Sequence, residues 1–137
     1  MAERIEGWAR EMLERGDVYG TLATISADGS PFQAVVWFLV RGDTLVVNSR
    51  VGRVWPTNVL RDPRVSLVVE DGYDWVGVRG RAQAVTDGAT AQADIAEMAR
   101  RYHADEPATA ERMVRAFEAQ ERISFVIGVE RVTEHPA

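Results

Sequence analysis

The sequence predicts a mainly β, α+β fold: six mostly antiparallel strands closed into a barrel, with flanking helices. Short apolar segments are separated by tight turns, such as those at 27–30 and 41–43. Residues 74–86 alternate between a face of small apolar side chains and a face carrying arginines, as expected for a sheet with one side in the core. Closure would also remove the exposed edges of apolar strands such as 65–69.

The chain is predicted to begin with an amphipathic helix over residues 3–15. Ile5, Trp8 and Met12 recur at helical spacing, and Gly16 stands where a helix would end. Barrel strands are then expected within about 18–86 and 122–132, at residues 19–26, 31–40, 44–48, 65–70, 74–86 and 122–132.

Two further helices are predicted between the last two strands, over about 88–103 and 107–120. Asp87 is a good N-cap for the first of them, and Pro107 suits the first turn of the second. We expect the helix 88–103 to cover one end of the barrel. Since the sequence shows no linker and no internal repeat, residues 1–137 are expected to form a single domain.

Composition excludes several classes of function. The chain has no cysteine and only two distant histidines, so we predict no disulfide and no metal site. A net charge of −5 argues against nucleic acid as a partner. The N-terminus lacks the apolar core of a signal peptide, and no apolar run approaches the roughly 20 residues that span a bilayer. We therefore expect a cytoplasmic protein that does not enter the membrane.

The segment 48–65 predicts an anion pocket. An apolar strand runs into Asn48 and Ser49, and two arginines, Arg50 and Arg53, then flank Gly52 ahead of a short helix. Backbone N–H groups at a helix start, a hydroxyl and guanidinium groups are the donors that bind phosphate. The glycine lets the backbone come close to a ligand. The segment therefore favours a phosphorylated cofactor.

Three segments in order resemble the flavin/deazaflavin oxidoreductases, which are similar to pyridoxamine 5′-phosphate oxidase. They are the turn Asp28-Gly29-Ser30-Pro31, the strand end Val36-Trp37-Phe38, and Asn58 to Leu67 with its Asp62-Pro63-Arg64-Val65 element. The resemblance covers about residues 3–132 and implies the FMN-binding type of split β-barrel. Within it, the chain is most similar to the subgroup that uses coenzyme F-420, an 8-hydroxy-5-deazaflavin, instead of FMN.

The resemblance implies a homodimer with two cofactor sites at the subunit interface. The strand after the Asp-Gly-Ser-Pro turn would run beside the ring of the cofactor, and the segment from Asn48 onward would hold its phosphate. Many relatives carry a lysine where this chain has Trp55, so phosphate binding here would depend on Arg50, Arg53 and backbone amides. The candidate cofactor-binding residues are Gln33, Ala34, Val35, Val36, Trp37, Asn48, Ser49, Arg50, Arg53, Val54, Trp55, Pro56, Asn58, Trp75 and Arg79.

Several of these residues have alternative interpretations. Trp37 is either a wall of the cofactor site or part of the core, and Trp55 either stacks on the ring or staples the short helix to the barrel. Trp75 lines either the partner's site or the dimer contact alone. Arg79 and Arg81 are either solvated or directed at an acidic tail of the ligand.

No acid–base pair, nucleophile or triad stands out, so we predict no catalytic side chain. This fits hydride transfer, in which the cofactor carries the chemistry and the protein binds and orients it. We expect an F-420-dependent oxidoreductase that reduces a small conjugated or quinone-like molecule. The alternatives are an FMN-binding oxidoreductase of the same fold and a flavin or haem carrier without turnover. Haem normally needs an axial histidine, and neither His103 nor His135 lies in the core of a predicted strand.

Overall fold

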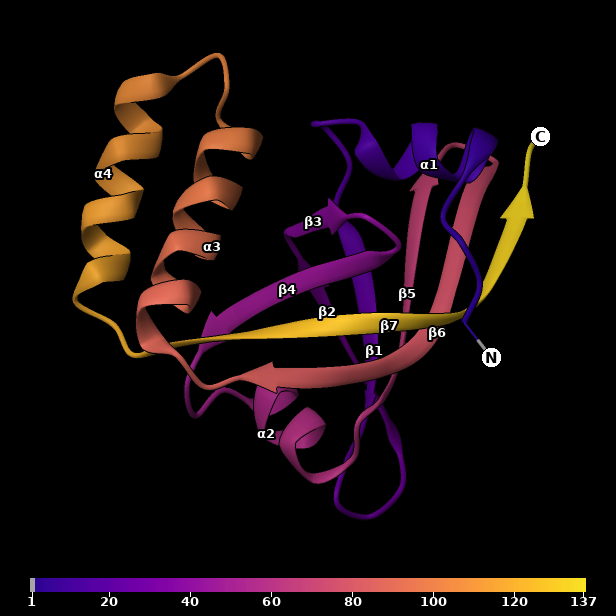
Figure 1. Cartoon of the computed structure of the whole chain (residues 1–137), viewed down its shortest axis with the longest axis horizontal. Coiled ribbons are helices and arrows are strands. Elements are labelled where there is room, and N and C mark those ends of the chain that lie inside the picture. The colour runs from indigo at the N-terminus through magenta and orange to yellow at the C-terminus, as the bar shows by residue number, and fades with distance from the viewer. Residues whose placement is uncertain (1) are drawn as a thin grey trace.

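The computed structural model describes residues 2–137, whose strands form one fully antiparallel sheet (Figure 1). The strands are β1 (Gly20–Ile25), β2 (Pro31–Val36), β3 (Phe38–Arg41), β4 (Thr44–Arg50), β5 (Arg64–Asp71), β6 (Asp74–Val85) and β7 (Arg122–His135). The helices are α1 (Gly7–Glu14), α2 (Val54–Arg61), α3 (Gly88–Tyr102) and α4 (Pro107–Glu118). Among the described residues, no helix is long and apolar enough to cross a membrane.

The sheet curls into a split barrel. Its strand order is β2-β1-β5-β6-β7-β4-β3, so β2 and β3 lie at opposite edges although only Trp37 separates them in the chain. The two edges must therefore approach each other at Trp37. Within residues 2–137 they do not pair with each other, which leaves the barrel open along that seam. The predicted antiparallel split barrel with flanking helices is confirmed.

The strand count differs from the prediction, with seven strands instead of six. The predicted strand 31–40 breaks at Trp37, because its first half pairs with β1 and its second half with β4. Val36 stands opposite Gly20, whereas Phe38 stands opposite Val47 on the far edge of the sheet. The apolar run through this corner gives no local signal of the change in partner.

Helix α1 begins at Gly7 and not at residue 3. Residues 2–6 are not helical: the amide of Glu3 donates to the carbonyl of Val129, that of Ile5 donates to Asp43, and Glu6 just before the helix is extended. At the other end of the chain, β7 continues to His135 and not only to 132, because its last residues pair with the start of β6.

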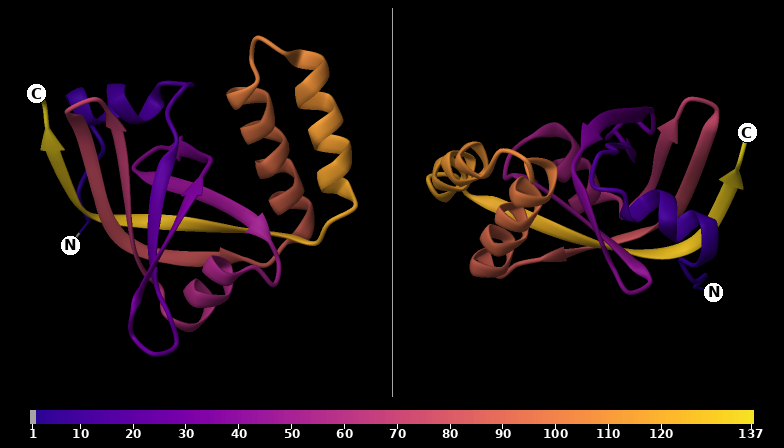
Figure 2. Two further views of the ribbon diagram at one scale, coloured as in Figure 1. Left: turned by 180° about the vertical axis from the view of Figure 1, so that it is seen from behind. Right: turned by 90° about the horizontal axis from the view of Figure 1, so that it is seen from above.

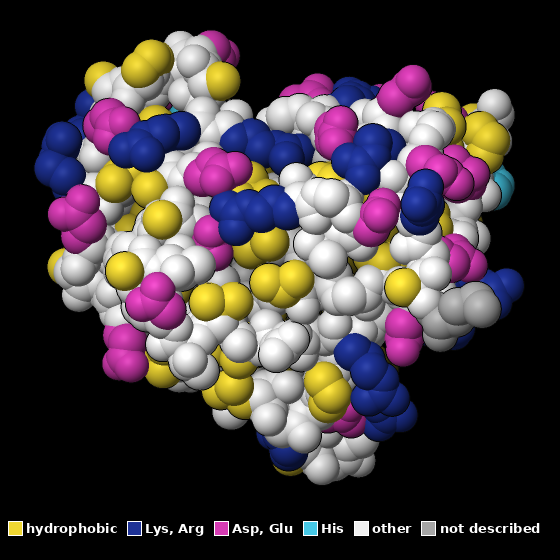
Figure 3. Space-filling view, in the orientation of Figure 1, with side chains coloured by type: hydrophobic (Ala, Val, Ile, Leu, Met, Phe, Trp, Pro, Cys, Tyr) yellow, Lys and Arg dark blue, Asp and Glu magenta, His cyan; other side chains and the backbone are white. Residues whose placement is uncertain are grey.

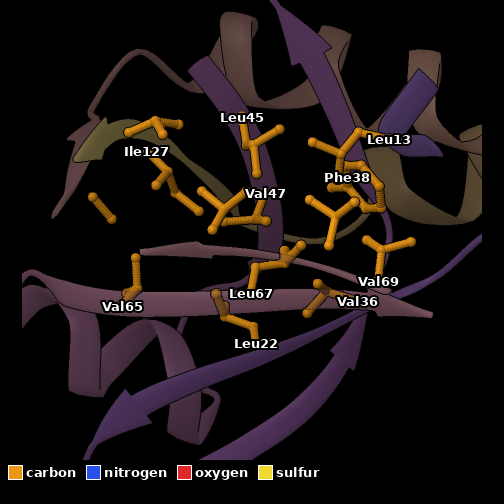
Figure 4. Packing of buried hydrophobic residues seen from close by; sticks show 14 of the residues in the cluster. Leu13, Leu22, Val36, Phe38, Leu45, Val47, Val65, Leu67, Val69 and Ile127 are labelled. Atoms are coloured by element: carbon orange, nitrogen blue, oxygen red, sulfur yellow. The ribbon is translucent and has the colours of Figure 1, made fainter. Parts of the chain in front are cut away.

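The main core fills the barrel with side chains from opposite sides of the curled sheet (Figure 4). Leu22 of β1, Leu45 of β4, Leu67 of β5 and Ile127 of β7 are all fully buried. Burying one such side chain contributes about 1.5–3 kcal/mol. This interior is the rigid frame on which the ends of β2 and β4 are held.

The α3–α4 hairpin stands beside the barrel (Figure 2). A second buried cluster joins α3 to the sheet through Leu39, Val46, Ile95 and Met98, and Trp37 and Phe117 pack against it. The hairpin therefore brings residues from late in the chain up to the corner at Trp37.

The long strand β6 bends where it crosses from one half of the barrel to the other (Figure 1), and its partner β7 carries a bulge with one extra residue, Glu130. The register between β6 and β7 shifts at Arg79 and Gly80. A Cβ at Gly80 would lie 2.0 Å from the carbonyl oxygen of Gly128, so only glycine allows the two backbones to come this close.

Candidate functional site

One pocket of about 300 Å³ opens where the ends of β2 and β4 meet the start of α2 and the α3–α4 hairpin. Hereafter it is termed the arginine pocket. It is lined by Tyr19, Val35, Val36, Trp37, Asn48, Ser49, Arg53, Trp55, Ile95, Phe117, Gln120 and Arg122. The structure thus brings the end of β2 and the segment after β4 to one site, as the sequence predicts.

The aromatic side of the pocket is built around Trp37. Its ring stacks on Tyr102, which in turn stacks on Tyr19, with ring centroids 5.3 Å apart in both pairs. Phe117 meets Trp37 edge-on at 6.3 Å. Trp37 therefore has both of the positions considered from the sequence: it packs against the second core cluster, and it also forms a wall of the pocket.

The polar side begins at the last residues of β4. Ser49 is only 5% exposed, and among residues 2–137 its hydroxyl makes no hydrogen bond. The chain then turns at Gly52, whose φ of 95° is readily adopted only by glycine. Arg53 is the N-cap of α2 and gives the helix no side-chain cap. The amides of Val54 and Trp55 in the first turn are thus without intrahelical partners, as at any helix start.

Arg122, the first residue of β7, is a third cation at the pocket. Its Nε donates to Oδ1 of Asn48 at 3.0 Å, and its Nη1 donates to Oε1 of Gln120 at 2.7 Å. The guanidinium also lies 4.7 Å from the ring centroid of Phe117. Burial, together with the positive charges of Arg53 and Arg50, lowers the pKa of Arg122 to about 10. At neutral pH Arg122 is still charged, and an anion would relieve this repulsion.

In residues 2–137 no carboxylate pairs with these guanidinium groups. Within the described chain, every ion pair involves other arginines, and Arg50, Arg53 and Arg122 have none. On the face of the molecule shown in Figure 3, basic and acidic side chains are interleaved. Three guanidinium groups without a carboxylate partner in the described residues, beside a free hydroxyl and a helix start, therefore have the donor chemistry of a candidate anion site.

Trp55 is the position at which the family resemblance implies a lysine in many relatives. It is nearly buried and packs against Phe125 at 5.6 Å between ring centroids, yet it also lines the pocket. Its indole therefore anchors α2 to the barrel and also forms part of the pocket lining. Arg122 lies at the same pocket and supplies a cation from another strand.

Residues 7–135 match the family model described as pyridoxamine 5′-phosphate oxidase. The chain belongs to the pyridoxamine 5′-phosphate oxidase family. No curated protein matches the sequence significantly. The resemblance inferred from the three sequence segments is thus confirmed at the level of the family.

Solved structures of this fold are similar over nearly the whole chain. An F-420 reductase is 27% identical with a TM-score of 0.71, and the match covers 93% of this chain and 97% of that one. A conserved hypothetical protein from Mycobacterium tuberculosis is 24% identical with a TM-score of 0.77, covering 98% and 88%. HutZ, a haem storage protein from Vibrio cholerae, is 20% identical with a TM-score of 0.69, covering 97% and 96%.

Three of the candidate cofactor-binding residues of this chain lie away from the arginine pocket. Gln33, Trp75 and Arg79 line a separate groove of about 270 Å³ on the outer face of the sheet, termed here the outer groove. Arg131, opposite Arg79 on β7, lines it too. Within one chain, these three candidates therefore lie apart from the other twelve.

The remaining candidates surround the pocket without lining it. Arg50 and Val54 are exposed beside it, Pro56 is buried in α2, and Ala34 packs against the barrel core. Asn58 is buried and cross-links α2 to β1: its Nδ2 donates to Oγ1 of Thr24 at 3.1 Å, and its Oδ1 accepts from Arg61. This arrangement gives Asn58 a structural role in the isolated chain.

Sequence reasoning missed Tyr19, Ile95, Phe117, Gln120 and Arg122 as lining residues. Arg122 reaches the pocket because β7 pairs with β4, which sets Arg122 opposite Arg50. That pairing joins residues far apart in the chain, so no local pattern reveals it. Among residues 2–137 no cluster of acidic or histidine side chains is arranged to hold a metal ion.

Proposed function

We propose that the arginine pocket binds the phosphate end of a flavin-type cofactor, and that the protein is an oxidoreductase dependent on coenzyme F-420. Its reaction would be hydride transfer to a small conjugated or quinone-like acceptor. The observation that carries this proposal is the set of three arginines without carboxylate partners, next to an aromatic wall and the free hydroxyl of Ser49. The similarity to an F-420 reductase at 27% identity supports it.

The residues present fit such a cofactor. Arg53, Arg122, the Ser49 hydroxyl and the first amides of α2 would hold the phosphate by charge-assisted hydrogen bonds. Val35 and Trp37 would lie against the ring system. When bound, the cofactor supplies the hydride, which is why no acid–base pair is needed in the pocket.

The chain contributes orientation and shielding from water. Ile95 and Phe117 bring apolar surface from the α3–α4 hairpin to the rim of the pocket, and Trp37 is held between Tyr102 and Phe117. A rigid wall of this kind keeps donor and acceptor rings in a reactive arrangement. An acceptor that stacks on a planar ring is itself expected to be planar and conjugated.

FMN is the alternative cofactor, because the arginines that carry the phosphate assignment fit it as well. Three guanidinium groups around a single pocket suit a terminal phosphate dianion, which is the form that FMN carries. The phosphate of F-420 is a diester followed by lactate and glutamates. Arg50, exposed at the mouth of the pocket, suits that acidic tail.

We further propose a homodimer with the cofactor at the subunit interface. Tyr19 and Val35, which line the pocket together, are 55% and 73% exposed. A contiguous exposed apolar patch of this kind is typical of a surface that a partner covers. In such a dimer the outer groove of one subunit would approach the pocket of the other and bring Trp75 and Arg79 to the cofactor.

The carrier alternative has less support as a haem site. The lining of the pocket contains no histidine: His103 packs edge-on against Trp37, and His135 stacks on Trp75. An axial imidazole for haem iron would therefore not come from this pocket's own lining.

Turnover tests the proposal. Reduced F-420 is mixed anaerobically with a quinone, and its re-oxidation is followed with and without the protein, in parallel with reduced FMN. We expect the wild-type protein to accelerate the reaction of F-420, with a higher KM for the coenzyme in Arg53→Gln. Acceleration with reduced FMN alone would establish the alternative cofactor, and no acceleration with either would overturn the enzymatic proposal.

A further inference from the structure

A buried carboxylate lies behind the arginine pocket, on the face of α3 that packs against the sheet. Asp94 is 3% exposed, although the other buried residues of α3 are alanine, isoleucine and methionine. An ionised carboxylate at such a position is strongly unfavourable unless its oxygens are paired. Its partners show what this carboxylate holds in place.

Both oxygens of Asp94 have partners. Oδ1 forms an ion pair with Nη1 of Arg41 at 2.8 Å, at the outer end of β3. Oδ2 accepts a hydrogen bond from the hydroxyl of Ser124 at 2.6 Å, and Ser124 is fully buried in β7. The carboxylate therefore connects a surface arginine to a hydroxyl in the interior.

The contacts of Ser124 fix the direction of the hydrogen bonds that follow. Because the serine gives its one proton to Asp94, its oxygen acts as acceptor for Nδ2 of Asn48 at 2.9 Å. The second proton of that amide goes to the carbonyl of Ala91, also at 2.9 Å. The amide oxygen of Asn48 is then turned toward Nε of Arg122.

The chain of bonds ends at the cation of the pocket. With Nε held by Asn48 and Nη1 held by Gln120, Nη2 of Arg122 has no hydrogen-bond partner in residues 2–137. Its two N–H groups, together with the second N–H of Nη1, are the donors left for a ligand. The plane of a guanidinium is set by where its donors are anchored, so the anchor decides how Nη2 is presented.

We propose that Asp94 is a positioning residue of the arginine pocket: acting through Ser124 and Asn48, it sets the orientation in which Arg122 meets the bound anion. Asp94 itself does not touch the ligand. The proposal rests on the proposed function of the pocket as a phosphate site. It extends that site to a residue on the far side of β4 and β7.

Two variants interrupt the chain at different points. Asp94→Ala removes the carboxylate at which the chain of hydrogen bonds begins, and it leaves Arg41 free to turn to Glu97, its other partner on the surface. Ser124→Ala breaks the next link but keeps the Arg41–Asp94 pair, so it tests the proposal if Asp94→Ala folds poorly. Glu97→Ala is the matched control. It also removes a carboxylate of α3 that pairs with Arg41, but Glu97 is not part of the chain of hydrogen bonds that leads to Arg122.

Two readouts separate positioning from stability. The first is solvent exchange of the Arg122 Nε–H by NMR, with the signal assigned by its loss in Arg122→Gln. We expect exchange about ten-fold faster in Asp94→Ala and Ser124→Ala and unchanged in Glu97→Ala. The second is the affinity for oxidised F-420, expected to fall about five- to ten-fold in the same two variants. In a protein that already carries Arg122→Gln, Asp94→Ala and Ser124→Ala should cause no further loss of affinity, because both residues act through the Arg122 guanidinium.

Two results would overturn the inference: unchanged exchange in both variants, or an affinity loss of the same size in the Arg122→Gln background. The latter would mean that Asp94 acts on the fold and not on Arg122. If Arg122→Gln alone leaves the affinity for F-420 intact, the proposed function fails. The exchange measurement then still decides whether Asp94 orients Arg122.

Discussion

The side chain of Arg122 donates from Nε to Oδ1 of Asn48 at 3.0 Å, and this bond ties the first residue of β7 to the end of β4. It places a cation with no carboxylate partner at the wall of the arginine pocket. Asn48 is itself anchored on α3 and β7 through Nδ2. The pocket thus combines a fixed guanidinium with the looser Arg50 and Arg53 of the following turn.

Replacing Asn48 with aspartate should weaken anion binding. In Asn48→Asp the new carboxylate would pair with Arg122 and cancel the charge that the ligand needs. We expect the affinity for F-420 or FMN to fall by about ten-fold or more, measured by fluorescence titration. An affinity equal to that of the wild type would show that Arg122 does not contact the ligand.

Replacing Gly80 should destabilise the barrel. The Cβ in Gly80→Ala would lie 2.0 Å from the carbonyl oxygen of Gly128, so the β6–β7 pairing must shift. We expect the free energy of unfolding to fall by about 2–3 kcal/mol in urea denaturation. Gly88→Ala, at the open start of α3, is the control and should be neutral or slightly stabilising. Equal effects at both sites would remove the close approach as the cause.

Asn58 distinguishes a structural from a ligand-binding role. Because it is buried and bonded to Thr24 and Arg61, Asn58→Ala should cost about 1–3 kcal/mol of stability. Cofactor affinity measured well below the unfolding temperature should stay close to that of the wild type. A large loss of affinity with little loss of stability would instead make Asn58 a ligand contact, as the family resemblance implies.

The turn between α2 and β5 should respond to acid. Side-chain and backbone hydrogen bonds from Arg64 lower the pKa of Asp62 to about 2, from an ordinary value of 3.8. A carboxyl with a lowered pKa adds stability above its ordinary pKa, and this contribution is lost as the pH falls toward its pKa in the folded protein. Urea midpoints of wild type and Asp62→Asn should therefore differ by a constant amount above pH 4, and the gap should close between pH 4 and 2. A gap independent of pH would contradict the pairing.

The sequence predicted the parts of the fold that depend on neighbours in the chain. Asp28 caps the β1–β2 turn through the amide of Ser30, and Asp87 caps α3 through the amide of Ala89, both within two residues. Local hydrogen bonds of this kind have recognisable residue patterns. The strand break at Trp37 has none, because the run on both sides is apolar and only the change of partner strand defines it.

The same division applies to the candidate site: residues close together in the chain were predicted, and a residue brought in by strand pairing was not. Ser49, Gly52 and Arg53 follow one another, so their pattern at a strand end indicated an anion pocket. Arg122 was missed, since its place depends on the pairing of β4 with β7 across more than seventy residues. Gln33, Trp75 and Arg79 stay predictions for the proposed dimer, because one chain alone places them in the outer groove.

The most direct test is a titration of F-420 and FMN against two charge-matched double variants. Trp37 and Trp55 line the pocket, so their fluorescence reports binding. Arg53→Gln/Arg122→Gln removes two pocket cations, whereas Arg112→Gln/Arg115→Gln removes two exposed cations from α4. We predict that wild type and the α4 variant bind F-420 with affinities within about three-fold, and that the pocket variant binds about 100-fold more weakly. Equal affinities for all three proteins would contradict the assignment of the arginine pocket as the cofactor site.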